Sequence, residues 1–322
     1  MKSAIVASDS VVAEHAGALL TTGAVEAVIA GALVAAAREA SVLFGPLQIL
    51  IGGAGAGLLA VDGRVRQPGL GAARPRGFRE EDEIPDAAYV GAPAFAAAAF
   101  AALALSGNDA TRATFAPALA AARTLSKSRH ELLDRISRNG AFALADSATS
   151  SELVAAVGRI SGGLLTAKDL ASAKATVEKC VVHTNIDREI ACAPWSTAAR
   201  ASSSTIHFVL AADARGRVAA ASYEVSSDAV PLSAFDLAAP RHASPVLRGK
   251  ERVRPGDTLP ACAPLAIFQT RAGWEAIVGA GDLTTDGIVE RGVGSIADVV
   301  RKLGSSARAI ARADDRLTVL SG

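Results

Sequence analysis

The chain has 322 residues, half of them hydrophobic and a fifth charged, which is the composition of a folded globular protein rather than a disordered one. The formal net charge is only +1, and Lys and Arg are spread along the sequence. The basic face that a nucleic-acid backbone requires is therefore not expected, and nucleic acid is excluded as a partner.

The cysteines and the apolar segments narrow the class of protein further. Cys180, Cys192 and Cys262 are odd in number and lack C-x-x-C spacing, so we expect small buried side chains rather than disulfides or a metal site. The apolar start of the chain is too short for a signal peptide, and the apolar stretch 92–105 is too short to cross a bilayer. These features predict a soluble, cytoplasmic protein with no cofactor, no metal and no membrane partner.

The first 70 residues predict a small sheet with two helices. The expected elements are a strand at 3–7, helices at 11–20 and 24–40, and strands at 47–51, 58–61 and 64–67. A strand follows the glycine-rich segment 52–57, whereas a phosphate-binding loop needs a helix there, so we interpret the glycines as a close backbone approach inside a sheet. Asp62-Gly63 is a typical hairpin dipeptide, and we expect the chain to turn at this point.

Helices dominate the middle of the chain and strands its last third. The predicted helices lie at 93–105, 111–126, 128–139, 150–159, 167–178 and 295–303. The predicted strands lie at 179–183, 189–193, 205–212, 218–225, 265–269 and 274–278, with a final hairpin turning at 314–315. Helices first and paired strands later predict sheets packed face to face with helices outside.

Several short motifs, in the same order and over nearly the whole chain, resemble the γ-glutamyltransferase family. Thr205-Ile206-His207-Phe208 resembles the family's T-T-H-F, whose first threonine is the nucleophile. The long helical insert that precedes this motif in the family is reduced here to residues 198–204. The other similar segments are 4–31, 52–62, 89–93, 162–166, 193–197, 254–264 and 303–306.

The resemblance implies an N-terminal-nucleophile (Ntn) hydrolase. The fold implied is α/β (α+β), a four-layer αββα sandwich with two stacked, mainly antiparallel sheets, forming one domain over residues 1–322. Autocleavage after Ser204 would divide the chain into 1–204 and 205–322 and make Thr205 the nucleophile, with its own α-amine as general base. An ordinary strand threonine is the alternative, and the serines at 202–204 carry the same hydroxyl group.

The residues that recognise glutamate in the family are largely replaced. The family's Ser-Ser pair falls on 260–261, which is Pro-Ala, and its α-carboxylate arginine falls at Gly71, with Arg74 and Arg76 nearby. The paired oxyanion glycines fall near Asp282, where a carboxylate would repel developing negative charge. The resemblance therefore implies a substrate other than glutathione.

Four further positions correspond to parts of the family's site. Glu224 and Ser226 replace a supporting threonine and an asparagine, Asp236 is the candidate acid for the substrate amine, and Gly279 precedes the oxyanion region. His207 shares the strand face of Thr205, and we expect it to have a structural hydrogen bond. Two functions remain open: hydrolysis or acyl transfer on a small-molecule amide, or an uncleaved, inactive homologue with a binding role, in either case with a homo-oligomer possible.

Overall fold

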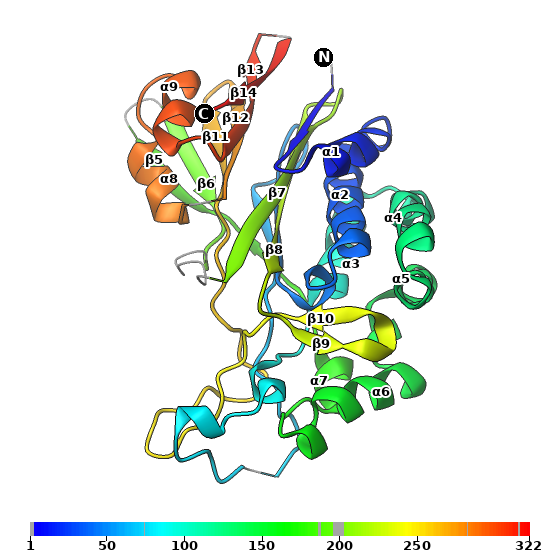
Figure 1. Ribbon diagram of the computed structural model, residues 1–322. Helices are drawn as coiled ribbons and strands as arrows, with labels where there is room; N and C mark the ends of the chain where they lie inside the picture. The colour runs from blue at the N-terminus through cyan, green and yellow to red at the C-terminus, as the bar shows by residue number, and fades with distance from the viewer. Residues whose placement is uncertain (1–2, 74, 186–187, 196–202, 282, 315) are drawn as a thin grey trace.

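Two six-stranded antiparallel sheets stack face to face in the computed structural model, with helices on their outer faces (Figure 1). The structure describes residues 3–73, 75–185, 188–195, 203–281, 283–314 and 316–322. The fold class predicted from the sequence, a layered αββα sandwich with mainly antiparallel sheets, is confirmed.

The two sheets draw their strands from both halves of the chain. The first sheet has, in order, β1 (Ala4–Ala7), β7 (Ser204–Ala212), β8 (Arg217–Ser226), β2 (Leu47–Gly53), β3 (Leu59–Gly63) and β4 (Thr176–Lys179). The second has β14 (Arg316–Ser321), β13 (Ala307–Ala313), β12 (Gly273–Ala280), β11 (Leu265–Thr270), β6 (Arg188–Cys192) and β5 (Val181–Asn185). A separate hairpin pairs β9 (Val230–Leu232) with β10 (Leu237–Ala239).

Helices cover both outer faces. On the first sheet lie α1 (Ser10–Gly17), α2 (Ala24–Arg38) and α3 (Phe95–Ser106), and outside α2 pack α4 (Thr111–Leu125) and α5 (Lys127–Asn139). The second sheet carries α8 (Thr285–Arg291) and α9 (Ile296–Leu303), while α6 (Ser147–Val157) and α7 (Ala167–Ser172) lie at the lower end of the molecule in Figure 1. The apolar helix α2 is buried almost throughout, because it is enclosed by α1, α4 and the first sheet.

Strand β7 separates two hydrophobic cores. Phe208 and Leu210 belong to the core between the sheets, whereas Val209 belongs to the core under the helices. Side chains alternate along a strand, so Ser204 shares the inter-sheet face with Phe208, and Thr205 lies on the helix face with Val209.

The first hairpin turns earlier than the Asp62-Gly63 dipeptide suggested. The connection between β2 and β3 is residues 54–58, inside the glycine-rich segment. Gly53 and Gly55 adopt φ values of 91° and 71°, a region that favours glycine. Gly63 instead ends β3, where an added Cβ would lie 2.4 Å from the Leu47 carbonyl oxygen. The predicted strand at 64–67 is therefore wrong.

The predicted helix 167–178 is too long. A capping box between Thr166 and Asp169 begins α7, but the helix ends at Ser172, and Thr176–Lys179 pairs with β3 as strand β4. Thr176 and Val177 are β-branched, which favours a strand over a helix. Helix α8 and the hairpin β9–β10 were not predicted.

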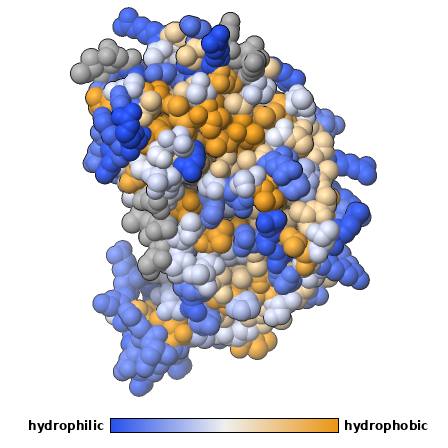
Figure 2. Space-filling view, turned by 45° about the horizontal axis from the view of Figure 1, so that its top comes forward, coloured by the Kyte–Doolittle hydropathy of each residue, from blue (hydrophilic) through white to orange (hydrophobic). Residues whose placement is uncertain are grey.

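Burial of the cysteines agrees with the sequence. Cys180, Cys192 and Cys262 are buried and form no disulfide. Burial raises the pKa of Cys180 and of Cys192 to about 12, so both remain protonated thiols. No described helix combines the length and the hydrophobicity needed to cross a bilayer. Figure 2 shows hydrophobic and hydrophilic residues interspersed on the visible face, with a larger hydrophobic area in its upper part.

Gly279 allows the two sheets to approach each other closely. A Cβ added to it would lie 2.7 Å from the ring of Phe208, which is fully buried. The structure therefore gives Gly279 a packing role between β12 and β7, next to the residues that begin β7.

Substitution Gly279→Ala should destabilise the protein, because the added methyl group collides with the Phe208 ring. Overpacking of this kind costs about 1–3 kcal/mol, and urea unfolding would measure the loss. Gly57→Ala is the matched control, since a Cβ there meets nothing within 4 Å. Equal unfolding free energies for the two variants would contradict the close packing of the sheets at this point.

Candidate active site

A buried polar cluster surrounds the first residue of β7. Ser204 is 4% exposed, and its Oγ donates a hydrogen bond to Oε1 of Glu224 on the neighbouring strand β8. Glu224 is also 4% exposed, and its Oε2 lies 3.3 Å from Nε2 of His242, which follows β10. A hydroxyl, a carboxylate and an imidazole therefore meet at one end of the first sheet.

The carboxylate at the centre of this cluster is held in its charged form. Burial acts to raise the pKa of Glu224, but His242 and the Ser204 hydroxyl outweigh burial and lower it below its usual value. Glu224 thus accepts hydrogen bonds as an anion over a wide pH range.

The peptide unit before Ser204 is also fixed. The carbonyl oxygen of Ser203 accepts hydrogen bonds from the backbone N–H of Ser227 at 3.0 Å and from the Ser227 hydroxyl at 2.9 Å. Two donors on one carbonyl polarise it and stabilise negative charge on its oxygen. The bond between Ser203 and Ser204 therefore has a polarised carbonyl on one side and a carboxylate-bonded hydroxyl on the other.

Ser226 and its neighbours support this segment. The Ser226 hydroxyl donates to Asp228 Oδ1 at 2.8 Å, and the Ser226 N–H donates to Oγ of Ser41 at 3.0 Å. Slight burial acts to raise the pKa of Asp228, but hydrogen bonds from Ser226 and Ser203, with the nearby Arg241, lower it. Ser226 lies at the rim of the cluster and orders the chain around Ser203.

Further polar side chains line the inter-sheet face of the first sheet from this cluster to β2 and β3, and together they form a polar wall. The Ser222 hydroxyl is buried and has no hydrogen-bond partner among the described residues. Its cross-strand partner Gln48 accepts a hydrogen bond from Trp195 Nε1 at 2.7 Å and donates to the Cys262 carbonyl at 2.8 Å. Because these groups share the inter-sheet face with Glu224, the wall extends beyond the cluster itself.

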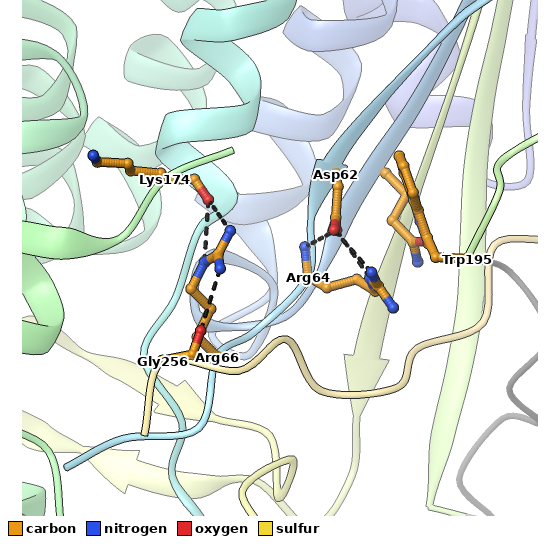
Figure 3. Close-up of polar contacts among 7 residues, drawn as sticks. Asp62, Arg64, Arg66, Lys174, Trp195 and Gly256 are labelled. Atoms are coloured by element: carbon orange, nitrogen blue, oxygen red, sulfur yellow. Dashed lines mark hydrogen bonds and ion pairs between the residues drawn. The ribbon is translucent and has the colours of Figure 1, made fainter. Parts of the chain in front are cut away.

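Figure 3 shows the far end of this wall. Asp62 accepts two hydrogen bonds from the Arg64 guanidinium, at 3.0 and 2.9 Å, and the guanidinium lies over the Trp195 ring, 5.3 Å from its centroid. Trp195 is the last described residue before the segment that leads to Ser203. Trp195 is thus bonded to the inter-sheet face through Gln48, and the Ser203 carbonyl is bonded to Ser227.

Thr205 lies outside the cluster. Its side chain is exposed and points to the helix side of β7, whereas the Glu224 carboxylate lies on the inter-sheet side. His207 shares the helix side, as the sequence predicted, where its Nδ1 lies 3.2 Å from Ser8 Oγ and its ring stacks on Tyr223. Burial lowers the pKa of His207, with Asp9 and Glu39 acting in the opposite direction.

Asp236 is not brought to the cluster either. It follows the short 3-10 helix at the tip of the β9–β10 hairpin, with a φ of 50°. Its carboxylate lies 3.1 Å from the buried guanidinium of Arg129, which also donates to the Asp236 carbonyl. Asp236 therefore connects the hairpin to α5 through Arg129, and the substrate contact expected from the sequence stays a prediction.

Two members of the cluster were not predicted. His242 lies in a loop with no motif around it, and Ser227 contributes through its backbone as much as through its hydroxyl. Only contacts between segments distant in the sequence reveal them. Among the described residues, no group of three or more His, Cys, Asp or Glu side chains is arranged to hold a metal ion.

Comparison with known proteins shows which solved structures share this fold. No protein-family model matches the chain, and no curated protein matches it. The crystal structure of cephalosporin acylase from Bacillus halodurans superposes with a TM-score of 0.75 at 12% identity, over 99% of this chain and 94% of that one. The structure of LmbA2991HD gives a TM-score of 0.62 at 13% identity, over 99% and 96%. The chain has the Ntn-hydrolase fold.

The Ntn resemblance proposed from the sequence is thereby confirmed at the level of the fold. Gamma-glutamyltranspeptidase from Helicobacter pylori overlaps less, with a TM-score of 0.48 at 18% identity over 57% of this chain and 68% of that one. The fold assignment rests on the two structures that span nearly the whole chain.

Substitution Glu224→Gln should destabilise the protein in a pH-dependent way. The folded-state pKa lies below the usual value of 4.5, so the carboxylate contributes stability above that value and loses it as pH falls through the folded pKa. We expect a loss of about 1–3 kcal/mol near pH 7 that shrinks near pH 3. Thermal unfolding of the wild type and the variant at both pH values measures this loss of stability. Glu178→Gln, on an exposed strand, is the control, and a loss independent of pH would contradict the charged state of Glu224.

Proposed function

We propose that the protein is an Ntn-type amide hydrolase or acyl transferase acting on a small-molecule amide, with Ser204 as its nucleophile. The observation that carries this proposal is the buried hydrogen bond between the Ser204 hydroxyl and Glu224 at the start of β7. It lies in a fold whose similar structures include cephalosporin acylase. A reactive hydroxyl needs a nearby acceptor for its proton, and Glu224 is the acceptor in contact.

Ser204 is preferred to Thr205 because of the face on which each side chain lies. Thr205, the nucleophile expected from the sequence motif, is one residue further along and therefore points to the opposite side of the sheet. Only Ser204 combines burial, a carboxylate partner and a polarised carbonyl before it. Thr205 remains the alternative nucleophile, and it requires cleavage one bond later.

Chain cleavage would proceed in two steps. The Ser204 Oγ attacks the Ser203 carbonyl carbon while its proton passes to Glu224, and the Ser227 donors stabilise the negative charge on the carbonyl oxygen. The C–N bond then breaks and the Ser204 nitrogen takes the proton, leaving an ester on Ser204 Oγ. Water hydrolyses this ester, which frees the Ser203 carboxylate and gives Ser204 both a hydroxyl and an α-amine.

Turnover would use the new amine as the base. Ser204 Oγ attacks the substrate amide carbon, and its proton passes through the α-amine to the leaving nitrogen. The acyl group on Ser204 is then transferred to water or to an acceptor amine. Glu224, with its low pKa, would orient the hydroxyl and pair with the α-ammonium form rather than store the proton itself.

An uncleaved binding protein is the second candidate. The same low pKa favours it, because a carboxylate that resists protonation is a weak base for the first, chain-cleaving step. Cleavage therefore distinguishes the two candidates before any substrate is known.

The nucleophile can be identified from the two adjacent hydroxyls. Ser204→Ala should abolish cleavage and any amidase activity, Ser204→Thr should retain part of both, and Thr205→Ala should behave like wild type because its side chain faces away from Glu224. Intact mass and N-terminal sequencing of the smaller fragment measure the outcome, which should begin Ser-Thr-Ile.

A fragment that begins Thr-Ile-His, together with loss of cleavage in Thr205→Ala but not in Ser204→Ala, would restore Thr205 as the nucleophile. A single full-length mass in both fresh and aged wild-type protein would favour the uncleaved binding protein. Thr205→Ala is also the matched control for folding, since it removes a hydroxyl from the same strand.

Turnover of a γ-glutamyl anilide should be very weak, below about 1 per second. The family's serine pair is replaced by Pro260 and Ala261, so the contacts to the glutamyl group are missing. A spectrophotometric assay of anilide release checks this expectation, with aryl-acyl anilides as the comparison. Efficient γ-glutamyl transfer would show that glutamate is recognised by other residues.

A further inference from the structure

We propose that the cavity between segments 67–73 and 246–255 binds a small molecule with an apolar body and an anionic head. This cavity has a volume of about 310 Å³ and lies in the loops at the lower end of the molecule. Its size is that of a small-molecule site, which typically begins near 300 Å³. In the lower part of Figure 2, where these loops lie, hydrophobic atoms are exposed among hydrophilic ones.

The walls of the cavity are mostly apolar. They include the side chains of Pro68, Ala72, Pro75, Leu164, Val253 and Pro255. Burying a hydrocarbon or aromatic group against these walls is favourable by about 25 cal/mol per Å² of apolar surface. The body of the ligand is therefore apolar.

The wall's neutral polar groups are already engaged inside the protein. The Gln67 amide donates to the Ser244 carbonyl at 2.9 Å and accepts from the Ser244 N–H at 2.9 Å. The N–H groups of Gly69 and Leu70 both donate to Asp169, at 2.9 Å each. A neutral polar head would therefore find few side-chain partners here.

Two guanidinium groups remain for the ligand. Arg252 and Arg254 line the cavity, and none of its described lining residues is Asp or Glu. Arg252 donates one hydrogen bond, to the Pro75 carbonyl oxygen at 3.3 Å. Among the described residues, the Arg254 side chain forms no hydrogen bond or ion pair. A planar guanidinium with several donors matches a carboxylate or a phosphate, so the head group is an anion.

The wall that carries the arginines is braced. Arg66 donates to the carbonyl oxygens of Gly256 at 3.3 Å and of Lys174 at 2.7 Å, which ties the residue after Pro255 to the chain beyond α7 (Figure 3). A second cavity of about 150 Å³ adjoins the first through Ala72, Pro75 and Leu164 and is lined by Arg159. The positive charge thus continues along the groove.

A short chain of contacts connects this cavity to the cluster of Ser204 and Glu224. Ser244, which holds Gln67, is two residues from His242, and two extended residues span at most about 7 Å. We therefore infer that the ligand is the substrate of the proposed amidase, an amide with an apolar, anionic portion. The substrate role rests on the proposed function, whereas the binding itself does not.

Saturation-transfer NMR with three probes of similar size tests the binding. The probes are 4-phenylbutyrate, 4-phenylbutan-1-ol and 4-phenylbutylamine, which differ only in the head group. We expect 4-phenylbutyrate to bind with a Kd near 1 mM or below, as its size predicts, and the alcohol and amine to bind at least about tenfold more weakly.

Variants locate the site. The double variant Arg252→Gln, Arg254→Gln should raise the Kd of 4-phenylbutyrate at least about tenfold. Ala72→Phe should abolish binding by filling the cavity. Arg248→Gln is the control, because Arg248 is on the same loop but bonds to the Gly77 carbonyl and does not line the cavity. Equal binding of the three probes, no detectable binding of the acid, or an unchanged Kd in the double variant would overturn the proposal.

Ser204→Ala separates this proposal from the proposed function. It should bind 4-phenylbutyrate like wild type while losing cleavage. If the acid binds as expected but wild-type protein never cleaves, the anion site stands and the amidase fails. If the protein cleaves but binding of 4-phenylbutyrate does not depend on Arg252 and Arg254, the proposed amidase is supported and the proposed anion site is wrong.

Discussion

The pairing register between β7 and β8 is the constraint on which the candidate site depends. It places Ser204 opposite Ser226 and Ile206 opposite Glu224, so the Ser204 hydroxyl and the Glu224 carboxylate fall on the same face. A slip of one residue would move Ser204 to the helix side and bring Thr205 to the cluster. Such a slip would also remove Phe208 from its buried position between the sheets, where its ring packs against Gly279.

The sequence predicts the layers of this protein better than its site. Periodicity and turn residues locate most helices and strands, including α2 and the β7–β8 hairpin, because each is specified by nearby residues. The turn at 54–58 was misplaced because Asp62-Gly63 carries a strong local signal that pairing with β2 and β4 overrides. Local patterns are reliable only where no distant partner competes with them.

The nucleophile expected from the sequence and the one that we propose are adjacent residues at the start of β7. A four-residue motif and a serine-rich linker pointed to the start of β7, but a motif cannot say which of two adjacent hydroxyls faces the carboxylate. Glu224 lies in contact with Ser204, whereas Asp236 is paired with Arg129, which comes from a helix more than a hundred residues away in the sequence. His242 and Ser227 depend wholly on contacts between distant segments, and no pattern within the sequence marks them.

Under the proposed function, the charge of Glu224 would make the cleaved chain a better catalyst than the uncleaved one. A buried carboxylate with a lowered pKa is a good partner for a cation and a poor store for a proton. Before cleavage, its described partners are a hydroxyl and an imidazole. Cleavage before Ser204 would place an α-amine on the residue already bonded to Glu224, and an amine has a pKa near neutrality, which suits it to accept and return protons at physiological pH. Under the proposed function, the same electrostatics would slow the first cleavage and would then hold the nucleophile and its base together in one buried site.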